Sequence, residues 1–260
     1  MGSWALFRMQ PLRLLLISLF FQLFLSFSQT QALGLVVILC LPVLSAGMLH
    51  VLHTVEQGGK PVLAFLFMPF ASGKIFGRLL LLGGLVLVVG LLVVSLVLTG
   101  QVVDIDTGLL SRIEQGDLEA LQLIDPQLME SAIMAMAIGA AISGSITYFS
   151  VPLIWFRKQG VISSVQLGLR ALFRNWRPLL VIGLLLGLVV VPIALLLGYF
   201  YLTALGGSGA SSWLAVLLLL LGPLFQLLLF GTQYLAFRDI FGLDVDTTGK
   251  ENPDASQLVA

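Results

Sequence analysis

Charged side chains are scarce in this chain of 260 residues. They make up 10% of the sequence and apolar residues make up 58%, whereas soluble domains carry about 25% charged and about 45–50% apolar residues. This balance excludes an ordinary soluble domain and favours a protein that lies within a membrane. The formal net charge is zero, so the charge gives no reason to expect nucleic acid as a partner.

Cysteine and histidine are nearly absent. The single cysteine, Cys40, excludes an intramolecular disulfide. The only histidines, His50 and His53, share one side of a predicted helix with Glu56, but the three side chains spread over about 120° of its surface. A closed tetrahedral metal site also needs a fourth ligand, so we expect no metal site here. Glu56 is instead expected to pair with Lys60, if the helix continues that far.

Sequence motifs of enzymes are also missing. The chain has no GxxxxGK[ST] phosphate loop, no GxSxG nucleophile elbow and no HExxH zinc motif. Hardly any charge falls at mid-membrane depth, where an ion-coupled pump usually carries one. We therefore expect no catalytic residue and no cofactor, and an active transporter is disfavoured.

Long apolar runs dominate what is present, and six of them are long enough, or nearly so, to cross a bilayer core of about 30 Å. The sequence predicts an all-α fold, a polytopic membrane helix bundle of six transmembrane helices in one domain, residues 1–242. The spans are expected near residues 12–28, 33–55, 76–99, 129–156, 179–202 and 213–237. A polar, disordered cytoplasmic tail, 243–260, is expected to follow. A signal peptide cleaved after Ala32 is a disfavoured alternative for the first run.

Basic residues fall almost entirely on one side of this arrangement. Only Arg112 lies on the other side. Loops rich in Lys and Arg stay in the cytoplasm, so both termini are expected to be cytoplasmic.

The outer segment 100–128 is acidic and carries an interrupted apolar stripe. Its acidic residues, with Glu130 just beyond, are Asp104, Asp106, Glu114, Asp117, Glu119 and Asp125. Asp125 followed by Pro126 is typical of a helix start. The segment is interpreted as a solvated linker, a cation-attracting vestibule or a surface that docks protein partners.

A short sequence pattern recurs ahead of the predicted spans. Ala5–Arg8 precedes the first span, Ala171–Arg174 precedes the fifth, and Gly73–Arg78 is a looser version before the third. The pattern predicts three repeated hairpins, each preceded by an amphipathic interfacial helix, although chance similarity in such biased composition is an alternative.

The segment Val161–Arg177 has apolar residues at helical spacing and is predicted to lie in the membrane interface. Its basic and aromatic residues are candidates for lipid-headgroup contacts, with simple anchoring of the topology as the alternative. These candidates are Arg170, Arg174, Arg177 and Trp176.

Polar residues within the apolar runs are few. Pro42, Pro152 and Pro223 are predicted to interrupt the second, fourth and sixth helices. Gln226 and Gln233 are seven residues apart and face the same way on the sixth helix. The two glutamines are candidates for lining a polar cavity, with hydrogen bonds between helices as the equal alternative.

The sixth run ends within Gly231–Gly242 in the sequence Tyr234-Leu235-Ala236-Phe237-Arg238-Asp239-Ile240-Phe241. This ending resembles a family of uncharacterised bacterial six-helix inner-membrane proteins. That family is loosely similar to the membrane domain of some glycerophosphodiester phosphodiesterases. The resemblance implies a bacterial inner (plasma) membrane and supplies no catalytic residues. The chain lacks the soluble phosphodiesterase domain, so that activity is not implied.

The sequence therefore favours a non-enzymatic membrane protein that organises lipids or partner proteins. A small permease or exporter for a lipid-like or apolar solute is the alternative, and intramembrane enzymology ranks third.

Overall fold

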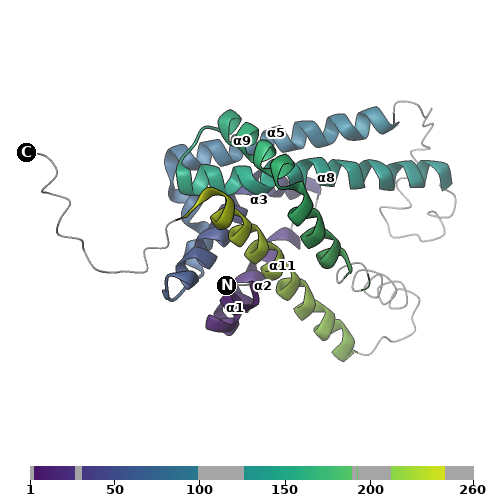
Figure 1. Ribbon diagram of the computed structural model, residues 1–260. Coiled ribbons are helices and arrows are strands. Elements are labelled where there is room, and N and C mark those ends of the chain that lie inside the picture. Colours follow the sequence, from purple (N-terminus) through teal and green to yellow (C-terminus); the bar gives the residue numbers. More distant parts are fainter. Residues whose placement is uncertain (1–2, 27–30, 99–125, 189–191, 193–211, 244–260) are drawn as a thin grey trace, which may run out of the picture.

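The structure is a computed structural model that describes residues 3–26, 31–98, 126–188, 192 and 212–243. These residues form helices and no strand (Figure 1), so the predicted all-α class is confirmed. The predicted acidic segment 100–128 up to residue 125, the end of the fifth predicted span, 179–202, and the tail after Leu243 lie outside the described residues.

The helices in chain order are α1 Ser3–Met9, α2 Pro11–Ser26, α3 Gln31–Glu56, α4 Ala64–Phe67, the 3-10 helix η2 Met68–Ala71, α5 Gly73–Leu98, α8 Pro126–Arg157, α9 Val161–Arg174, a helix Trp176–Leu188 and α11 Ser212–Phe241. Pro126 opens α8, as predicted, since the first helical turn needs no N–H from that residue.

Among the described residues, three helical segments are long and apolar enough to cross a membrane by themselves. They are Leu33–Glu56, Gly73–Val97 and Glu130–Arg157. A fourth is formed if Val161–Arg174 and Trp176–Leu188, which meet at 83°, are counted as one bent span. Such helices indicate a membrane-embedded protein, because a helix satisfies its own backbone hydrogen bonds in lipid.

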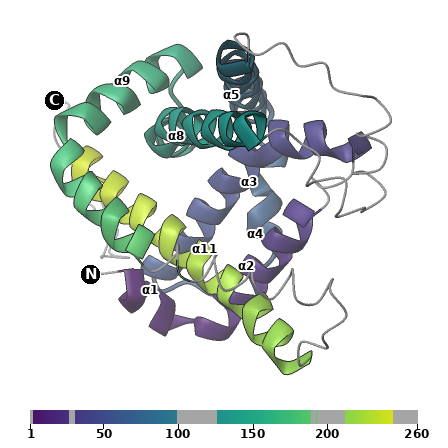
Figure 2. The same cartoon turned by 90° about the vertical axis from the view of Figure 1, so that its right-hand side faces the viewer.

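Several long helices pack against helices that are close to them in the chain, but α2 does not follow this pattern. α5 lies beside α8, as expected for the second predicted hairpin, and α9 folds back onto α8 (Figures 1 and 2). α2 contacts α11 more extensively than it contacts α3. The predicted set of three repeated hairpins is therefore not confirmed.

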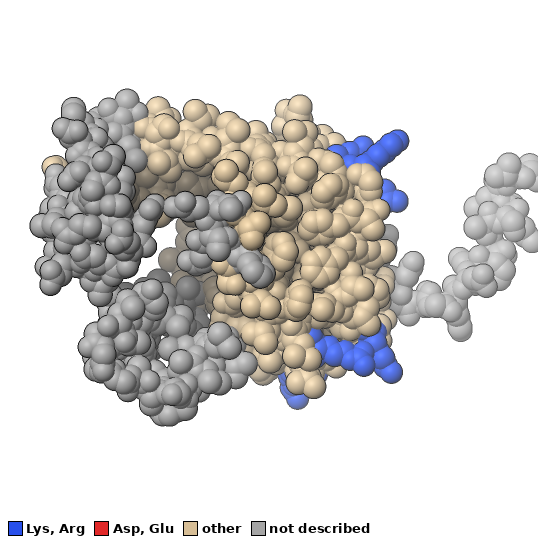
Figure 3. Space-filling model, turned by 180° about the vertical axis from the view of Figure 1, so that it is seen from behind, with Lys and Arg blue, Asp and Glu red and all other residues tan. Residues whose placement is uncertain are grey.

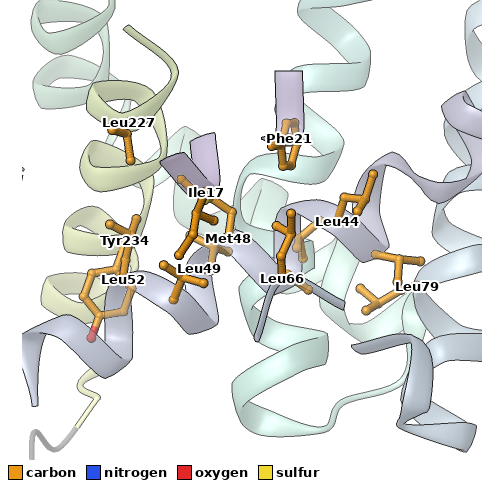
Figure 4. Close-up of a cluster of buried hydrophobic side chains, with 14 of the residues drawn as sticks. Ile17, Phe21, Leu44, Met48, Leu49, Leu52, Leu66, Leu79, Leu227 and Tyr234 are labelled. Carbon is orange, nitrogen blue, oxygen red and sulfur yellow. The ribbon is translucent and has the colours of Figure 1, made fainter. Parts of the chain in front are cut away.

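The core surrounds the second half of α3, where Leu44, Met48, Leu49 and Leu52 are buried (Figure 4). Gly47 makes this packing close. A Cβ at this position would lie 1.9 Å from the carbonyl oxygen of Leu66 in α4, so only glycine lets the two backbones approach this far.

The end of α3 corrects one prediction. α3 stops at Glu56, and Gly58 takes a positive φ of 76°. The N–H groups of Gly58 and Gly59 bond to the carbonyls of Val55 and Thr54 at 3.0 and 2.9 Å, which is the pattern of a Schellman helix end. Because the helix does not continue, Lys60 does not come one turn above Glu56.

The predicted interfacial helix Val161–Arg177 is also shorter than expected. α9 ends at Arg174, and the next helix starts at Trp176 after the 83° bend. Pro178 explains the break, since it has no N–H to bond to the carbonyl of Arg174. Placed in the first turn of the new helix, the same proline costs no hydrogen bond.

The interfacial helix expected before the third span is not continuous in the structure, since the chain there folds into α4, η2 and the start of α5. Its aromatic side chains pack against the core instead of forming one interfacial face. These side chains are Phe65, Phe67, Phe70 and Phe76.

Candidate functional site

A group of polar side chains joins the end of α3 to α11, and we call it the α3–α11 clamp: His53, Glu56, Tyr234 and Arg238. Glu56 accepts hydrogen bonds from Tyr234 Oη on one carboxylate oxygen and from Arg238 Nη1 on the other. Its side chain is 5% exposed. Burying a carboxylate is costly unless a counter-charge and hydrogen bonds accompany it, and Arg238 and Tyr234 supply them.

The two histidines have separate surroundings. His53 Nδ1 lies 2.8 Å from Tyr234 Oη, and His53 Nε2 lies 3.0 Å from Gln57 Nε2. His50 instead contacts the rings of Phe65 and Trp155. No three His, Cys, Asp or Glu side chains in the described ranges are close enough to hold a metal ion.

The polar groups of the clamp thus have partners within it or in Gln57 and Asp239, and the bonds between Glu56 and the α11 residues tie the two helices together. Figure 4 shows Tyr234 beside Leu52, where α11 crosses α3. We interpret the clamp as structural.

The remainder of the Tyr234–Phe241 ending also fixes the end of α11. Phe237 is fully buried and stacks between Phe156 and Phe241, with ring centroids 5.8 and 5.1 Å away. Arg157 of α8 donates hydrogen bonds to the carbonyls of Phe241 and Gly242. The ending that carries the family resemblance therefore anchors α11 to α3 and α8.

Gln233 provides a second link between helices. Its Nε2 donates to the carbonyl of Tyr148 in α8 at 2.7 Å. Pro152 lies four residues after Tyr148 inside α8, so this carbonyl lacks its usual N–H partner. The glutamine replaces the missing donor.

Gln226, the other predicted cavity residue, lies where α11 meets α2. Its Oε1 accepts a hydrogen bond from Ser18 Oγ at 3.3 Å, and the same hydroxyl donates to the carbonyl of Pro223 at 2.9 Å. Both glutamines that the sequence singled out thus make hydrogen bonds between helices, which was one of the two interpretations left open.

The predicted headgroup residues come together around the bend between α9 and Trp176–Leu188, which we call the basic elbow: Arg170, Arg174, Trp176 and Arg177. All four side chains are exposed. The guanidinium carbon of Arg177 lies 5.7 Å from the ring centre of Trp176, which is within cation–π range.

A pocket of about 510 Å³ lies beside the basic elbow, between α9 and the end of α11. It is lined by Leu167, Arg170, Ala171, Arg174, Asn175, Asp239, Ile240 and Phe241. Neither Arg170 nor Arg174 has an ion-pair or hydrogen-bond partner within the part of the chain that the structure describes. The one carboxylate of the lining, Asp239, accepts two hydrogen bonds from Arg238 at 3.1 and 3.0 Å, so the pocket favours an anion.

The buried face of α9 explains how the elbow is held. Ser164 and Gly168 lie against α8, and a Cβ at Gly168 would be 3.2 Å from Phe149 Cβ. Ile162 and Phe173 are 75% and 70% exposed on the rest of the helix. α9 is therefore fixed to α8 by small residues and presents apolar and basic side chains outward.

Sequence reasoning missed the pairing of Glu56 with Arg238. One signal was available: Glu56 is the only acidic residue before Asp104, so its burial would require a distant basic partner. Known proteins give no further indication of the site, because no family model, no curated protein and no solved structure matches the chain.

Proposed function

We propose that this chain is a non-enzymatic integral protein of a bacterial inner membrane that binds anionic lipid headgroups at its cytoplasmic face. The observation that carries the proposal is the basic elbow, where Arg170 and Arg174 line a pocket without being neutralised by a partner. A basic pocket between membrane helices suits a phosphate headgroup.

The exposed apolar side chains around the elbow support the same function. Phe173 and Trp176 are 70% and 52% exposed, and they flank the basic residues in the sequence. Aromatic rings of this kind insert at the headgroup level while arginines reach the phosphates. The elbow thus has the two components that an interfacial lipid site requires.

The distribution of charge supports the cytoplasmic placement. On the face shown in Figure 3, the Lys and Arg side chains of the described residues gather at the end of the molecule where α11 finishes. From this charge distribution we infer six membrane spans with both termini in the cytoplasm. Three spans are the long apolar helices named above, and the other three contain α2, Trp176–Leu188 and α11. The short helices α1, α4 and α9 precede α2, α5 and Trp176–Leu188, and this order supports a repeated two-helix unit.

Analysis of the lipids that co-purify with the protein tests this function against that of a permease. The protein is extracted in mild detergent, and its retained lipids are compared with the total membrane extract. Enrichment of anionic phospholipid is expected. A retained mixture with the composition of the bulk membrane, together with stabilisation by an apolar solute, would favour the permease instead.

A further inference from the structure

The apolar face of α2 borders a groove that lies apart from the α3–α11 clamp and from the basic elbow. The groove has a volume of about 1080 Å³ and lies between α2 and the segment Pro61–Leu63. This volume is at the upper end of the roughly 300–1,000 Å³ of ligand pockets in general, so it has room for a large ligand.

The walls of the groove are mainly aliphatic and aromatic. On α2 they include Leu16, Phe20 and Leu23, which are 55%, 39% and 57% exposed. Val62 and Leu63 face them and are 48% and 39% exposed. Side chains this apolar require an apolar occupant, since water in the groove would leave them unfavourably hydrated.

The length of the groove fits one lipid chain. Arg13 and Ser26 line its two ends along α2, and thirteen residues of helix rise about 20 Å. Half of a bilayer core is about 15 Å thick. An acyl chain that starts near Arg13 would therefore follow α2 to about the middle of the membrane.

The Arg13 end of the groove is positively charged. Gln10 Nε2 donates to the carbonyl of Gly59 at 3.1 Å, which holds the start of α2 beside the chain that leads to Lys60 and Pro61. Arg13 and Lys60 are both exposed, and neither has an ion-pair or hydrogen-bond partner among the described residues. Glu56, the acidic residue nearest in sequence, is already bound by Arg238.

We propose that this groove binds one anionic glycerophospholipid, with its phosphate at Arg13 and Lys60 and an acyl chain along Leu16, Phe20 and Leu23. Two complementary features support this site: an apolar channel of one chain length, and two cations that are unpaired in the described ranges. Of these, Arg13 lines the groove and Lys60 adjoins the lining residue Pro61. This lipid site uses no residue of the basic elbow, so the two sites are independent.

Photocrosslinking locates the lipid directly. The full-length protein is reconstituted in phosphatidylcholine vesicles that contain a trace of phosphatidylglycerol with a photoreactive acyl chain, and the adducts are mapped by mass spectrometry. Adducts are expected on α2 between Leu16 and Leu23 and on Pro61–Leu63. The matching phosphatidylcholine probe should label these sites about tenfold less, because each basic residue near an anionic group contributes severalfold to binding.

Variants separate the groove from the general membrane surface. Leu16→Trp places a larger ring in the wall of the groove, in the path of the acyl chain, and should abolish the adducts. Leu12→Trp introduces the same ring at an exposed position of α2 outside the groove and should leave them. Arg13→Gln/Lys60→Gln should reduce phosphatidylglycerol labelling to the level of phosphatidylcholine. The variant Arg170→Gln/Arg174→Gln should keep groove labelling.

Equal labelling by the two lipids in the unaltered protein would overturn the proposal, and so would adducts that persist in Leu16→Trp. Intact groove labelling in an unaltered protein that retains no excess of anionic lipid at the elbow would count against the proposed function alone.

Discussion

Gln233 of α11 donates a hydrogen bond, 2.7 Å long, to the one carbonyl of α8 that Pro152 deprives of its helical partner, that of Tyr148. A side chain of one helix thus completes the backbone of another. Gln233 is 8% exposed and is packed beside Tyr234, a member of the α3–α11 clamp. The proline and the glutamine, 81 positions apart in the sequence, form one structural unit.

This unit makes a prediction about coupled substitutions. Gln233→Leu should lower the free energy of unfolding by about 1–2 kcal/mol, because the buried carbonyl of Tyr148 is left unsatisfied. In a Pro152→Ala background the same substitution should cost less than half as much, since the N–H of the new alanine can bond that carbonyl. Thermal unfolding in detergent measures both. Equal costs in the two backgrounds would show that the hydrogen bond does not compensate for the proline.

The α3–α11 clamp is expected to be a main determinant of stability. Arg238→Gln should destabilise the protein by about 3 kcal/mol, because it leaves the buried carboxylate of Glu56 without its counter-charge. Asp239→Asn is the matched control, since the side chain of Asp239 is 67% exposed and its ion pair contributes at most about 1 kcal/mol. Similar melting temperatures for the two variants would contradict the importance of the clamp.

Close contact at Gly47 gives a third prediction. Gly47→Ala should lower stability by about 1–3 kcal/mol, because the added methyl group overlaps the carbonyl of Leu66. Gly90→Ala adds the same group in α5, where no atom lies within 4 Å of the new Cβ, and should be neutral or stabilising by up to about 1 kcal/mol. If Gly47→Ala unfolds at the temperature of the unaltered protein, α3 and α4 do not approach as closely as described.

The orientation in the membrane is testable with reporter fusions. A fluorescent protein fused after Gly242 should be bright, and alkaline phosphatase inserted within Gly116–Leu123 should be active, since the basic residues indicate a cytoplasmic C-terminus and an outer acidic segment. The reciprocal fusions serve as controls. Phosphatase activity after Gly242 would reverse the proposed topology.

Continuous apolar runs correctly predicted the all-α class. Three of the six expected spans, or four with the bent pair, are present among the described residues as helices long and apolar enough to cross a membrane. The start of α8 at Pro126 followed from residue type. The prolines predicted to interrupt three helices, Pro42, Pro152 and Pro223, instead lie inside the continuous helices α3, α8 and α11. The positions of helix ends were less predictable. Gly58 ends α3 before Lys60, and Pro178 divides the expected interfacial helix at Asn175.

The clamp could not be predicted, because its partners are far apart in sequence. Glu56 and Arg238 are separated by 182 positions, and helical periodicity relates only residues within a few turns. Helical periodicity does predict that Arg170 and Arg174, four residues apart, lie on the same side of α9. Their pocket, however, depends on the end of α11, which only the fold supplies.

The lipid content of elbow variants tests the central proposal most directly. The variant Arg170→Glu/Arg174→Glu/Arg177→Glu is purified alongside the unaltered protein and alongside Arg8→Glu/Lys74→Glu, which reverses basic residues of α1 and α5 outside the elbow pocket. Anionic phospholipid per protein should fall clearly in the elbow variant, since each arginine contributes about 1 kcal/mol to attraction by an anionic surface. It should change little in the control. An elbow variant that folds normally and retains as much anionic phospholipid as the unaltered protein would contradict the account.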